Sequence, residues 1–370
     1  MLRKFSVENF KCFQGRFVLD LSKPGNYSFN SDCIRNGIVD KAAIYGVNGI
    51  GKSNLGLAIF DLINHLSDNC KEVEKYNNFI NLDGSKPYVY FEYEFQFEKD
   101  IVVYKYSKIN YKTLIEESLS INGKEMIYYD YRAKKGSSSF AGSEVLSLEG
   151  DSNNSRVKYI MGTAVLKDDN KENAVLLKFQ NFVDKMLLFY SLRKNGFIGF
   201  KQDASLLEKV IIDANKVEDF EKFINSQGLH KKLIVVDTPE GKKLYFQHKH
   251  GLIHYFNECS TGMESLILLY SWLIVLDQCS FVYIDEFDAF YHYELAEMIV
   301  KKLKDYKNTQ IIVTTHNTDL MNNDLLRPDC YFVLTEEKID SLNRLTEKDL
   351  RLAHNLQKMF KAGAFDENNI

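Results

Sequence analysis

The sequence predicts an α/β fold in which a mixed, mainly parallel central sheet is accompanied by N-terminal antiparallel strands and a helical insert lobe. Three observations support this fold class. The segment Gly46–Ser53 has the pattern G-x-x-x-x-G-K-S and lies between a short apolar strand and a helix pattern. Strand and helix patterns alternate from 261 to 334. The chain opens with short alternating stretches that are typical of antiparallel strands.

Residues 1–110 predict an antiparallel strand pair, a third strand and a hairpin, with one helix between them. The strand pair turns at Asn9-Phe10-Lys11. The helix is expected to begin near Gly51, directly after the glycine loop. Dense aromatic alternation on both sides of Glu98-Lys-Asp100 predicts the hairpin. The expected strands are 2–10, 15–21, 42–45, 88–97 and 101–109.

Residues 111–231 are interpreted as the helical insert lobe, which interrupts the core. Serine, glycine and asparagine are concentrated in 134–155, and this composition predicts a flexible loop. Apolar residues then recur at helical spacing, which predicts helices over about 171–193 and 204–227. No heptad pattern continues far enough to predict a long coiled coil.

The remaining residues predict the second part of the core, 232–350, and a helical tail, 351–370. Three short strands come first. In the alternating region that follows, each helix can connect two parallel strands of one sheet. The expected strands are 233–236, 243–247, 252–256, 281–284, 310–314 and 330–334, and the expected helices are 261–276 and 292–304.

The glycine loop has the composition that a phosphate-binding loop requires. Gly46, Gly49 and Gly51 lack a Cβ, so successive backbone N–H groups can converge on phosphate oxygens. The helix that follows would present the positive end of its dipole to the same anion. Lys52 is expected to reach the β- and γ-phosphates, and the Ser53 hydroxyl is expected to bind Mg²⁺.

An acidic pair, Asp285 and Glu286, follows the strand Phe281-Val-Tyr-Ile284. That strand is entirely aromatic or aliphatic, so both of its faces are expected to be buried. Carboxylates at such a strand end are costly unless they face a cation or water at the carboxyl edge of the sheet. Asp285 is therefore expected to complete the Mg²⁺ site, and Glu286 to orient or deprotonate an attacking water.

Two further segments complete the series. Val313-Thr-Thr-His316 ends the next strand at the same edge, where His316 could donate to the γ-phosphate. Ser260-Thr261-Gly262 begins an apolar helix, whose free N–H groups form a second anion site. In a fold of this type, that helix faces the nucleotide of a second copy rather than its own. The four segments together predict ATP and Mg²⁺ as cofactors, held in composite sites that only a homodimer completes.

The composition excludes several other classes of protein. The net charge of −4 and the pI of about 6.1 give no overall attraction to nucleic acid, although a local basic groove for DNA stays compatible with them. The six cysteines include no C-x-x-C pair, so a zinc site and a disulfide framework are not expected and a reducing cytoplasm fits best. The N-terminus lacks the apolar core of a signal peptide, and Leu266–Leu276 is too short to span a bilayer.

Three histidines raise the alternative of a metal site. His248 and His250 would share one face of a strand, and His254 follows closely. A polar strand end and turn explains the same residues, and we prefer that interpretation.

The opening Val7-Glu-Asn9-Phe10-Lys11-Cys-Phe13, taken with the four segments, resembles the RecF/SMC/OLD branch of ABC-type ATPases. The chain resembles most the stand-alone ATPases of the AAA-15/AAA-21 group, which are common in prokaryotic defence operons. The resemblance also includes Asp285–His292, Thr314–Met321 and Asn355–Gly363, and so covers most of the chain. It implies an ABC-type P-loop ATPase head.

The resemblance also implies roles for individual residues and a mode of action. Asn48 and Asn54 join the nucleotide-binding residues, and Asp288 becomes the residue of the D-loop that contacts the second subunit. Glu286, His316 and Lys52 are the implied catalytic residues. The protein would be an ATPase that acts as a dimerising nucleotide switch and controls a separate effector protein from the same operon, in antiviral defence.

The chain departs from the family pattern in places, and alternatives stay open. The signature segment Cys259-Ser-Thr-Gly262 differs from the more common Ser-Ser-Gly-Thr, and no glutamine stands out as the Q-loop residue. A RecF-like ATPase that binds DNA in repair or DNA-end sensing is the main alternative. The nucleotide-binding subunit of a transporter is disfavoured by the length of chain between Lys52 and Ser260.

Overall fold

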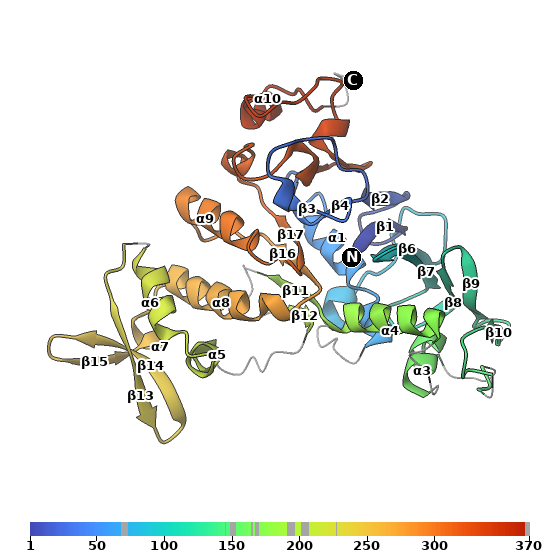
Figure 1. Ribbon diagram of the computed structural model, residues 1–370, viewed down its shortest axis with the longest axis horizontal. Coiled ribbons are helices and arrows are strands. Elements are labelled where there is room, and N and C mark those ends of the chain that lie inside the picture. Colours follow the sequence, from blue (N-terminus) through green and yellow to red (C-terminus); the bar gives the residue numbers. More distant parts are fainter. Residues whose placement is uncertain are drawn as a thin grey trace.

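The computed structural model describes residues 1–366 apart from 68–72, 145, 149–152, 164–165, 167–169, 191–196, 201–206 and 227. This part of the chain contains two seven-stranded sheets, a two-stranded sheet and a three-stranded sheet, and the three-stranded sheet projects from one end (Figure 1). The two large sheets touch where the backbone N–H of Leu2 donates to Gln310 Oε1 at 2.9 Å. A single buried core extends from one large sheet to the other.

The N-terminal sheet is antiparallel, with the strand order β10-β9-β8-β7-β6-β1-β2. Alternate side chains of β6 are buried, and Phe95 on this strand packs against Phe179 with 5.2 Å between ring centroids. The hairpin predicted around Glu98 is confirmed, because β6 and β7 pair along their whole length. The strands are β1 (Leu2–Glu8), β2 (Phe17–Asp20), β6 (Val89–Phe97), β7 (Asp100–Lys108), β8 (Leu114–Ile121), β9 (Lys124–Asp130) and β10 (Lys135–Ser138).

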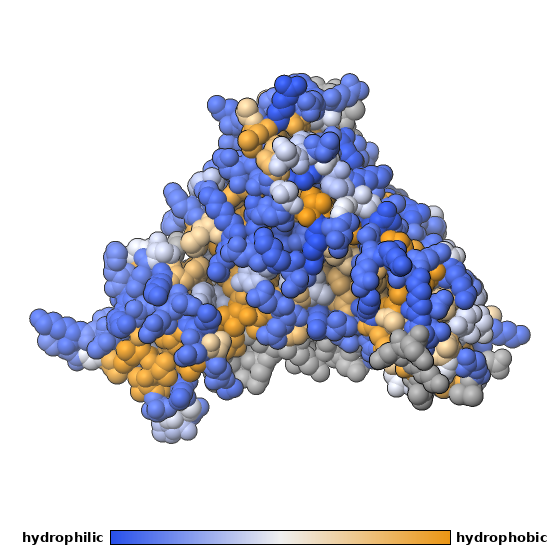
Figure 2. Space-filling model, viewed as in Figure 1, coloured by the Kyte–Doolittle hydropathy of each residue, from blue (hydrophilic) through white to orange (hydrophobic). Residues whose placement is uncertain are grey.

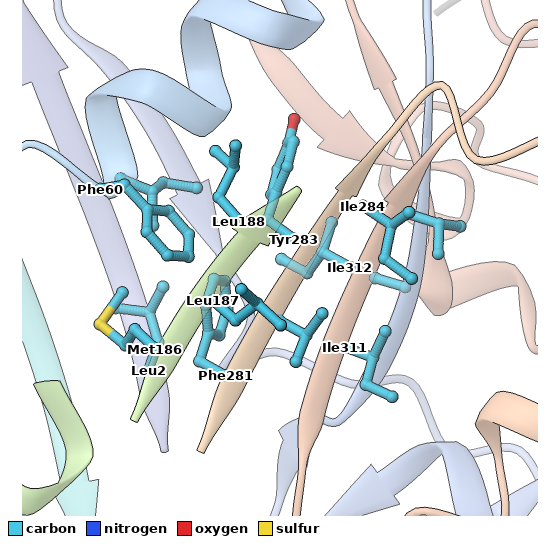
Figure 3. Packing of buried hydrophobic residues seen from close by; sticks show 14 of the residues in the cluster. Leu2, Phe60, Met186, Leu187, Leu188, Phe281, Tyr283, Ile284, Ile311 and Ile312 are labelled. Atoms are coloured by element: carbon cyan, nitrogen blue, oxygen red, sulfur yellow. The ribbon is translucent and has the colours of Figure 1, made fainter. Parts of the chain in front are cut away.

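The central sheet has the order β12-β11-β16-β17-β5-β18-β19. Its five inner strands are parallel and its two edge strands are antiparallel, which confirms the predicted mixed sheet. Every residue of β5, β11, β16 and β17 is buried, and Figure 3 shows apolar side chains of three of these strands packed together. The strands are β5 (Lys41–Tyr45), β11 (Met186–Tyr190), β12 (Phe197–Gly199), β16 (Phe281–Asp285), β17 (Gln310–Thr314), β18 (Tyr331–Leu334) and β19 (Ile339–Ser341).

The prediction of one helix over 171–193 is wrong in its second half. Helix α4 spans Lys171–Asp184, and the chain then forms β11, which pairs in parallel with β16. The run Met186–Tyr190 is apolar at every position because both faces of a central parallel strand are buried. Such a short apolar run cannot be distinguished from the continuation of a helix by periodicity alone. Residues 111–231 are therefore not only helical, since they supply β8–β10 to one sheet and β11–β12 to the other.

Helices cover both faces of the central sheet and support the smaller sheet. The expected helices at 261–276 and 292–304 are confirmed as α8 and α9. The helices are α1 (Lys52–Ile59), α2 (Ile63–Leu66), α3 (Arg156–Thr163), α4, α5 (Leu207–Asp213), α6 (Val217–Asn225), α7 (Tyr255–Glu258), α8 (Thr261–Val275), α9 (Tyr293–Leu303) and α10 (Leu356–Lys361). The remaining strands are β3 (Ile34–Arg35), β4 (Ile38–Val39), β13 (Lys232–Thr238), β14 (Gly241–His248) and β15 (Gly251–His254).

Three other sequence-based expectations meet the structure only in part. The predicted loop at 134–155 contains β10, which pairs with β9, while 145 and 149–152 lie outside the described residues. The expected helix at 204–227 is two helices, α5 and α6. Residues 204–206 and 227 lie outside the described residues. The tail contains α10, and 367–370 are not described.

The face shown in Figure 2 is mainly hydrophilic, with an apolar patch at its lower left, where β13–β15 lie in Figure 1. Val235, Leu252 and Ile253 of this small sheet are among the exposed apolar residues. None of the helices in the described ranges is both long and apolar enough to cross a membrane.

Candidate nucleotide-binding site

Three loops meet at one edge of the central sheet. Strands β5, β16 and β17 are adjacent and parallel, so their carboxyl ends lie at the same edge. In the register of the sheet, Ile284 pairs with Val313 and Thr314 pairs with Ile44. The glycine loop after β5, the acidic pair at the end of β16 and the histidine after β17 are therefore neighbours in space, although they are far apart in the sequence.

The glycine loop connects β5 to α1, and its glycines meet steric requirements that other residues would not. Gly49 and Gly51 have φ values of 81° and 115°, which L side chains rarely adopt. A Cβ on Gly46 would lie 2.9 Å from the backbone oxygen of Leu334, and one on Gly51 would lie 2.5 Å from Cys12 Sγ. Since Gly51 directly precedes α1, the N-terminal N–H groups of this helix open onto the loop.

Lys52 is folded back over the loop that precedes it. Its Nζ donates to the backbone oxygens of Gly46 at 2.9 Å and Val47 at 3.3 Å. The same Nζ lies 3.4 Å from His316 Nδ1, which links the glycine loop to the histidine loop. Burial lowers the pKa of Lys52, and the carboxylates of Glu286 and Asp285 oppose that shift. A phosphate would offer this ammonium stronger acceptors than the two carbonyls.

Ser53 and Asp285 are in direct contact. Ser53 Oγ donates to Asp285 Oδ2 at 2.6 Å, and Thr314 Oγ1 donates to Asp285 Oδ1 at 2.9 Å. Asp285 is almost completely buried at the end of β16. One hydroxyl and one carboxylate are hard oxygen ligands of the kind that Mg²⁺ binds, usually together with phosphate oxygens and water. The residues present therefore fit a Mg²⁺–nucleotide site.

Glu286 begins the turn after β16 in an unusual backbone conformation. Its φ is 50°, in the left-handed region that is unfavourable for a residue with a Cβ. The backbone N–H of Glu286 donates to Thr314 Oγ1 at 2.8 Å. Its Oε1 lies 3.8 Å from His316 Nε2. Both side chains border a cavity of about 350 Å³, whose lining is completed by Asp288, Ala289, Tyr291 and Asn317.

His316 is expected to act in its neutral form, which gives a prediction for the pH dependence. Burial and the neighbouring Lys52 ammonium lower the pKa of His316 below its usual 6.5. The lysine donates toward Nδ1, so the single proton of the neutral ring lies on Nε2. We expect kcat/KM for ATP hydrolysis, which reports the free enzyme, to fall as the pH drops through this lowered pKa of His316.

A pH series of kcat/KM with wild type and His316→Gln tests this prediction. The variant should be slower, and the part of the acidic limb that comes from His316 should disappear because glutamine does not titrate. An unchanged acidic limb in the variant would show that another group is responsible.

Asp288 is held next to the same cavity. Thr315 Oγ1 donates to Asp288 Oδ2 at 2.8 Å and accepts the backbone N–H of Asn317 at 2.9 Å. Burial is the main cause of the raised pKa of Asp288, and the bond from Thr315 opposes it. The loop after β16 and the loop after β17 are thus joined at a second point.

The structure does not bring Ser260 and Gly262 to this site. Both lie at the N-terminus of α8, which starts beside α6 and α7, away from α1 (Figure 1). Ser260 Oγ accepts the backbone N–H of Met263 at 3.4 Å, which is a helix cap. Asn48 and Asn54, which were also expected to bind the nucleotide, belong to the glycine loop and to α1, respectively. Asn48 is exposed in the loop, and Asn54 Nδ2 donates to Cys12 Sγ at 3.1 Å.

Sequence reasoning did not find the cavity of about 580 Å³ that opens beside the glycine loop. Its lining combines Gly49 and Ile50 with residues from both ends of the chain. It is large enough for a nucleoside whose phosphates lie over the loop. Its remaining lining residues are Cys12, Gln14, Gly15, Phe17, Glu336 and Glu337, and of these only Cys12 lies in a segment that the sequence analysis singled out.

Several hydroxyl groups that support the site were also missed. Tyr283 OH donates to the backbone oxygen of Lys52 at 2.7 Å and so fixes the first turn of α1 to β16. Thr314 and Thr315 were noted only as neighbours of His316. Two adjacent threonines at the buried end of a strand were the available signal, because a buried hydroxyl needs a polar partner.

The histidine-rich segment is explained without a metal. His248 Nε2 lies 2.6 Å from Glu258 Oε2, and His254 Nε2 lies 3.4 Å from Glu208 Oε2. Among the described residues, no group of three or more His, Cys, Asp or Glu side chains could hold a metal ion.

A family model described as "AAA domain, putative AbiEii toxin, Type IV TA system" matches residues 41–322. The chain belongs to this AAA family. The matched range includes the glycine loop, Asp285, Glu286 and His316. Among curated proteins, no match was found.

Solved structures that match this AAA-family chain include three SMC heads. The first is an SMC head bound to the C-terminal winged-helix domain of ScpA, at 16% identity and a TM-score of 0.49, covering 93% of this chain and 98% of that one. The second is the SMC head domain from Thermotoga maritima, at 16% identity and a TM-score of 0.45. This match covers 92% of this chain and 98% of that one. The third is an SMC head domain with an extended coiled coil, bound to the C-terminal domain of ScpA and derived from Pyrococcus furiosus. It has 15% identity and a TM-score of 0.44, and the match covers 93% of this chain and 97% of that one.

Proposed function

We propose that this protein binds and hydrolyses ATP and acts as a nucleotide switch that dimerises around two composite sites. The observation that supports this most strongly is the convergence of Lys52, Ser53, Asp285, Glu286 and His316 at one sheet edge, with direct contacts between them. Each of these side chains offers one of the functions that phosphoryl transfer to water requires.

The proposed role of each residue follows from the chemistry of its side chain. Lys52 releases the loop carbonyls and donates to phosphate oxygens instead. Ser53 and Asp285 would hold Mg²⁺, which neutralises charge that develops on the phosphates. Glu286 accepts a proton from the attacking water, and His316 donates its Nε2 proton toward the γ-phosphate. The cavity of about 580 Å³ beside Gly49 would take the nucleoside.

The second half of each site would come from another copy of the chain. Helix α8 has 15 residues, and the free N–H groups and positive dipole end at its N-terminus suit a phosphate. It lies away from the glycine loop of its own chain (Figure 1). A two-fold dimer would place Ser260 and Gly262 of each copy over the nucleotide of the other. Asp288, at the cavity beside Glu286, would contact the second subunit.

The biological output would be the control of a separate effector protein in defence against phage. The family description connects this AAA domain with toxin–antitoxin systems. A switch of this type needs a partner that distinguishes the closed ATP form from the open form, because a ligand or partner shifts an equilibrium only through its difference in affinity. A dimer that instead clamps DNA would show strong salt dependence of duplex binding.

Mixing two inactive variants tests the composite site. Lys52→Ala should strongly weaken nucleotide binding at its own glycine loop, and Gly262→Asp should place a carboxylate against the phosphate of the other copy. The Cβ of a residue at position 262 has space, since its nearest neighbour is Ser260 Oγ at 3.8 Å. An equal mixture should recover about a quarter of wild-type turnover, because half of the dimers are mixed and each has one intact site. A mixture as inactive as its two components would contradict the composite site.

A further inference from the structure

We propose that Thr314 is a positioning residue whose single hydroxyl holds both carboxylates of the site, Asp285 for the metal and Glu286 for the water. This inference rests on the proposed ATPase function, since it concerns the same site. It assigns a role to a residue for which the sequence pattern had suggested none.

The hydroxyl of Thr314 has two partners, and its two bonds have defined directions. It donates its only proton to Asp285 Oδ1 at 2.9 Å and accepts the backbone N–H of Glu286 at 2.8 Å. Thr314 is fully buried as the last residue of β17. Water therefore cannot easily replace either bond, and removal of the hydroxyl would leave a buried carboxylate oxygen and a buried N–H unpaired.

The first bond orients the carboxylate of Asp285. With Oδ1 bound to Thr314, the other oxygen, Oδ2, is the one that contacts Ser53 Oγ. Ser53 and Oδ2 are the pair that would bind Mg²⁺. The hydroxyl of Thr314 thus determines which carboxylate oxygen is presented to the metal, without binding the metal itself.

The second bond stabilises the turn that carries Glu286. A φ of 50° is unfavourable for glutamate, so an additional interaction is needed to hold the backbone there. The N–H of Glu286 supplies that interaction through Thr314, and the N–H of Phe287 donates to the backbone oxygen of Thr314 at 3.1 Å. In this conformation the Glu286 side chain leaves the line of β16 and approaches His316.

Thr314→Val tests the inference because valine keeps the shape and removes the hydroxyl. We expect kcat for ATP to fall about 10- to 100-fold with KM changed less than about 3-fold, the loss expected for bonds to a charged group. The Mg²⁺ concentration for half-maximal binding of a fluorescent ATP analogue should rise about 10-fold. In the nucleotide-free protein, the Glu286 amide should exchange its hydrogen faster.

Two variants serve as controls. Thr314→Ser keeps the hydroxyl and should restore all three measurements to near wild type. Thr309→Val removes another fully buried hydroxyl of the chain, which binds the backbone oxygens of Leu276 and Cys279 at the opposite end of β17. It should lower thermal stability but leave the Mg²⁺ requirement, kcat and Glu286 exchange unchanged.

The outcomes separate this inference from the proposed function. If Thr314→Val behaves like Thr309→Val in all three measurements, or if Thr314→Ser is as impaired as Thr314→Val, the positioning role is wrong. If the wild type hydrolyses no ATP, the proposed function fails, while Glu286 exchange still decides whether Thr314 holds the turn. Should Thr314→Val not fold, Thr314→Ala provides the same comparison.

Discussion

Replacing Glu286 by glutamine is expected to lower ATP turnover by about 10²- to 10⁴-fold, the range for loss of a general base, while ATP binding stays intact. Glutamine has the same shape but cannot accept a proton from water. The side chain lies beside His316 at the cavity and not in the glycine loop, so the contacts to the phosphates should be unaffected. Release of phosphate under single-turnover conditions, together with ATP affinity from titration, measures both quantities.

Glu347→Gln is a suitable control for this experiment. It removes the same charge from an exposed position outside the two cavities described above and should not change turnover. A Glu286→Gln variant that keeps more than about a tenth of wild-type turnover would exclude Glu286 as the general base.

Replacing Lys52 by alanine is expected to weaken ATP binding by about 10²- to 10⁴-fold. Hydrogen bonds to charged groups contribute about 1.5–3 kcal/mol each, and two such bonds to phosphates would therefore contribute about 3–6 kcal/mol. The Nζ of Lys52 already lies over the loop, 2.9 Å from the backbone oxygen of Gly46, so it needs only a short movement to reach a phosphate. Isothermal titration with Mg²⁺–ATP measures the loss directly.

Lys242→Ala on the small sheet is the matched control, because it removes an exposed lysine of β14 far along the chain from the glycine loop. Its ATP affinity should stay within about 3-fold of wild type, as is usual for surface substitutions. If Lys52→Ala also binds ATP within that range, the glycine loop does not hold the phosphates.

The sequence predicted that three segments meet at one sheet edge, because each segment is marked by a local pattern. A glycine loop between strand and helix, an acidic pair after an apolar strand and a histidine after the next strand each mark a strand end. Parallel strands then bring those ends to one edge. Residues 41–322, which contain all three segments, match the AAA family model.

What the sequence did not predict depends on contacts between distant segments. The role of Thr314 follows from the pairing of β17 with β16, which puts its hydroxyl beside Asp285 and the Glu286 amide. The cavity beside Gly49 joins Cys12, Gln14, Gly15 and Phe17 with Glu336 and Glu337, which are distant in the sequence. Strand β11 was taken for part of a helix because Met186–Tyr190 is apolar at every position.

The N-terminus of α8 shows a different limit of prediction from the sequence. The sequence correctly placed the start of this helix at Thr261, but a helix terminus does not reveal which nucleotide it serves. Within the described residues it lies away from the glycine loop of its own chain. Only the dimer would give Ser260 and Gly262 a role in the nucleotide site, so the oligomeric state is central to the proposal.

The most direct test is the native mass of Glu286→Gln, produced together with the genes that neighbour its own, in Mg²⁺–ATP and in Mg²⁺–ADP. The proposal predicts two copies of the chain with ATP, joined by a second protein as effector, and single copies with ADP. Single copies that carry bound ATP would contradict the dimeric switch. Two copies that retain DNA and no second protein would support a DNA-binding ATPase instead.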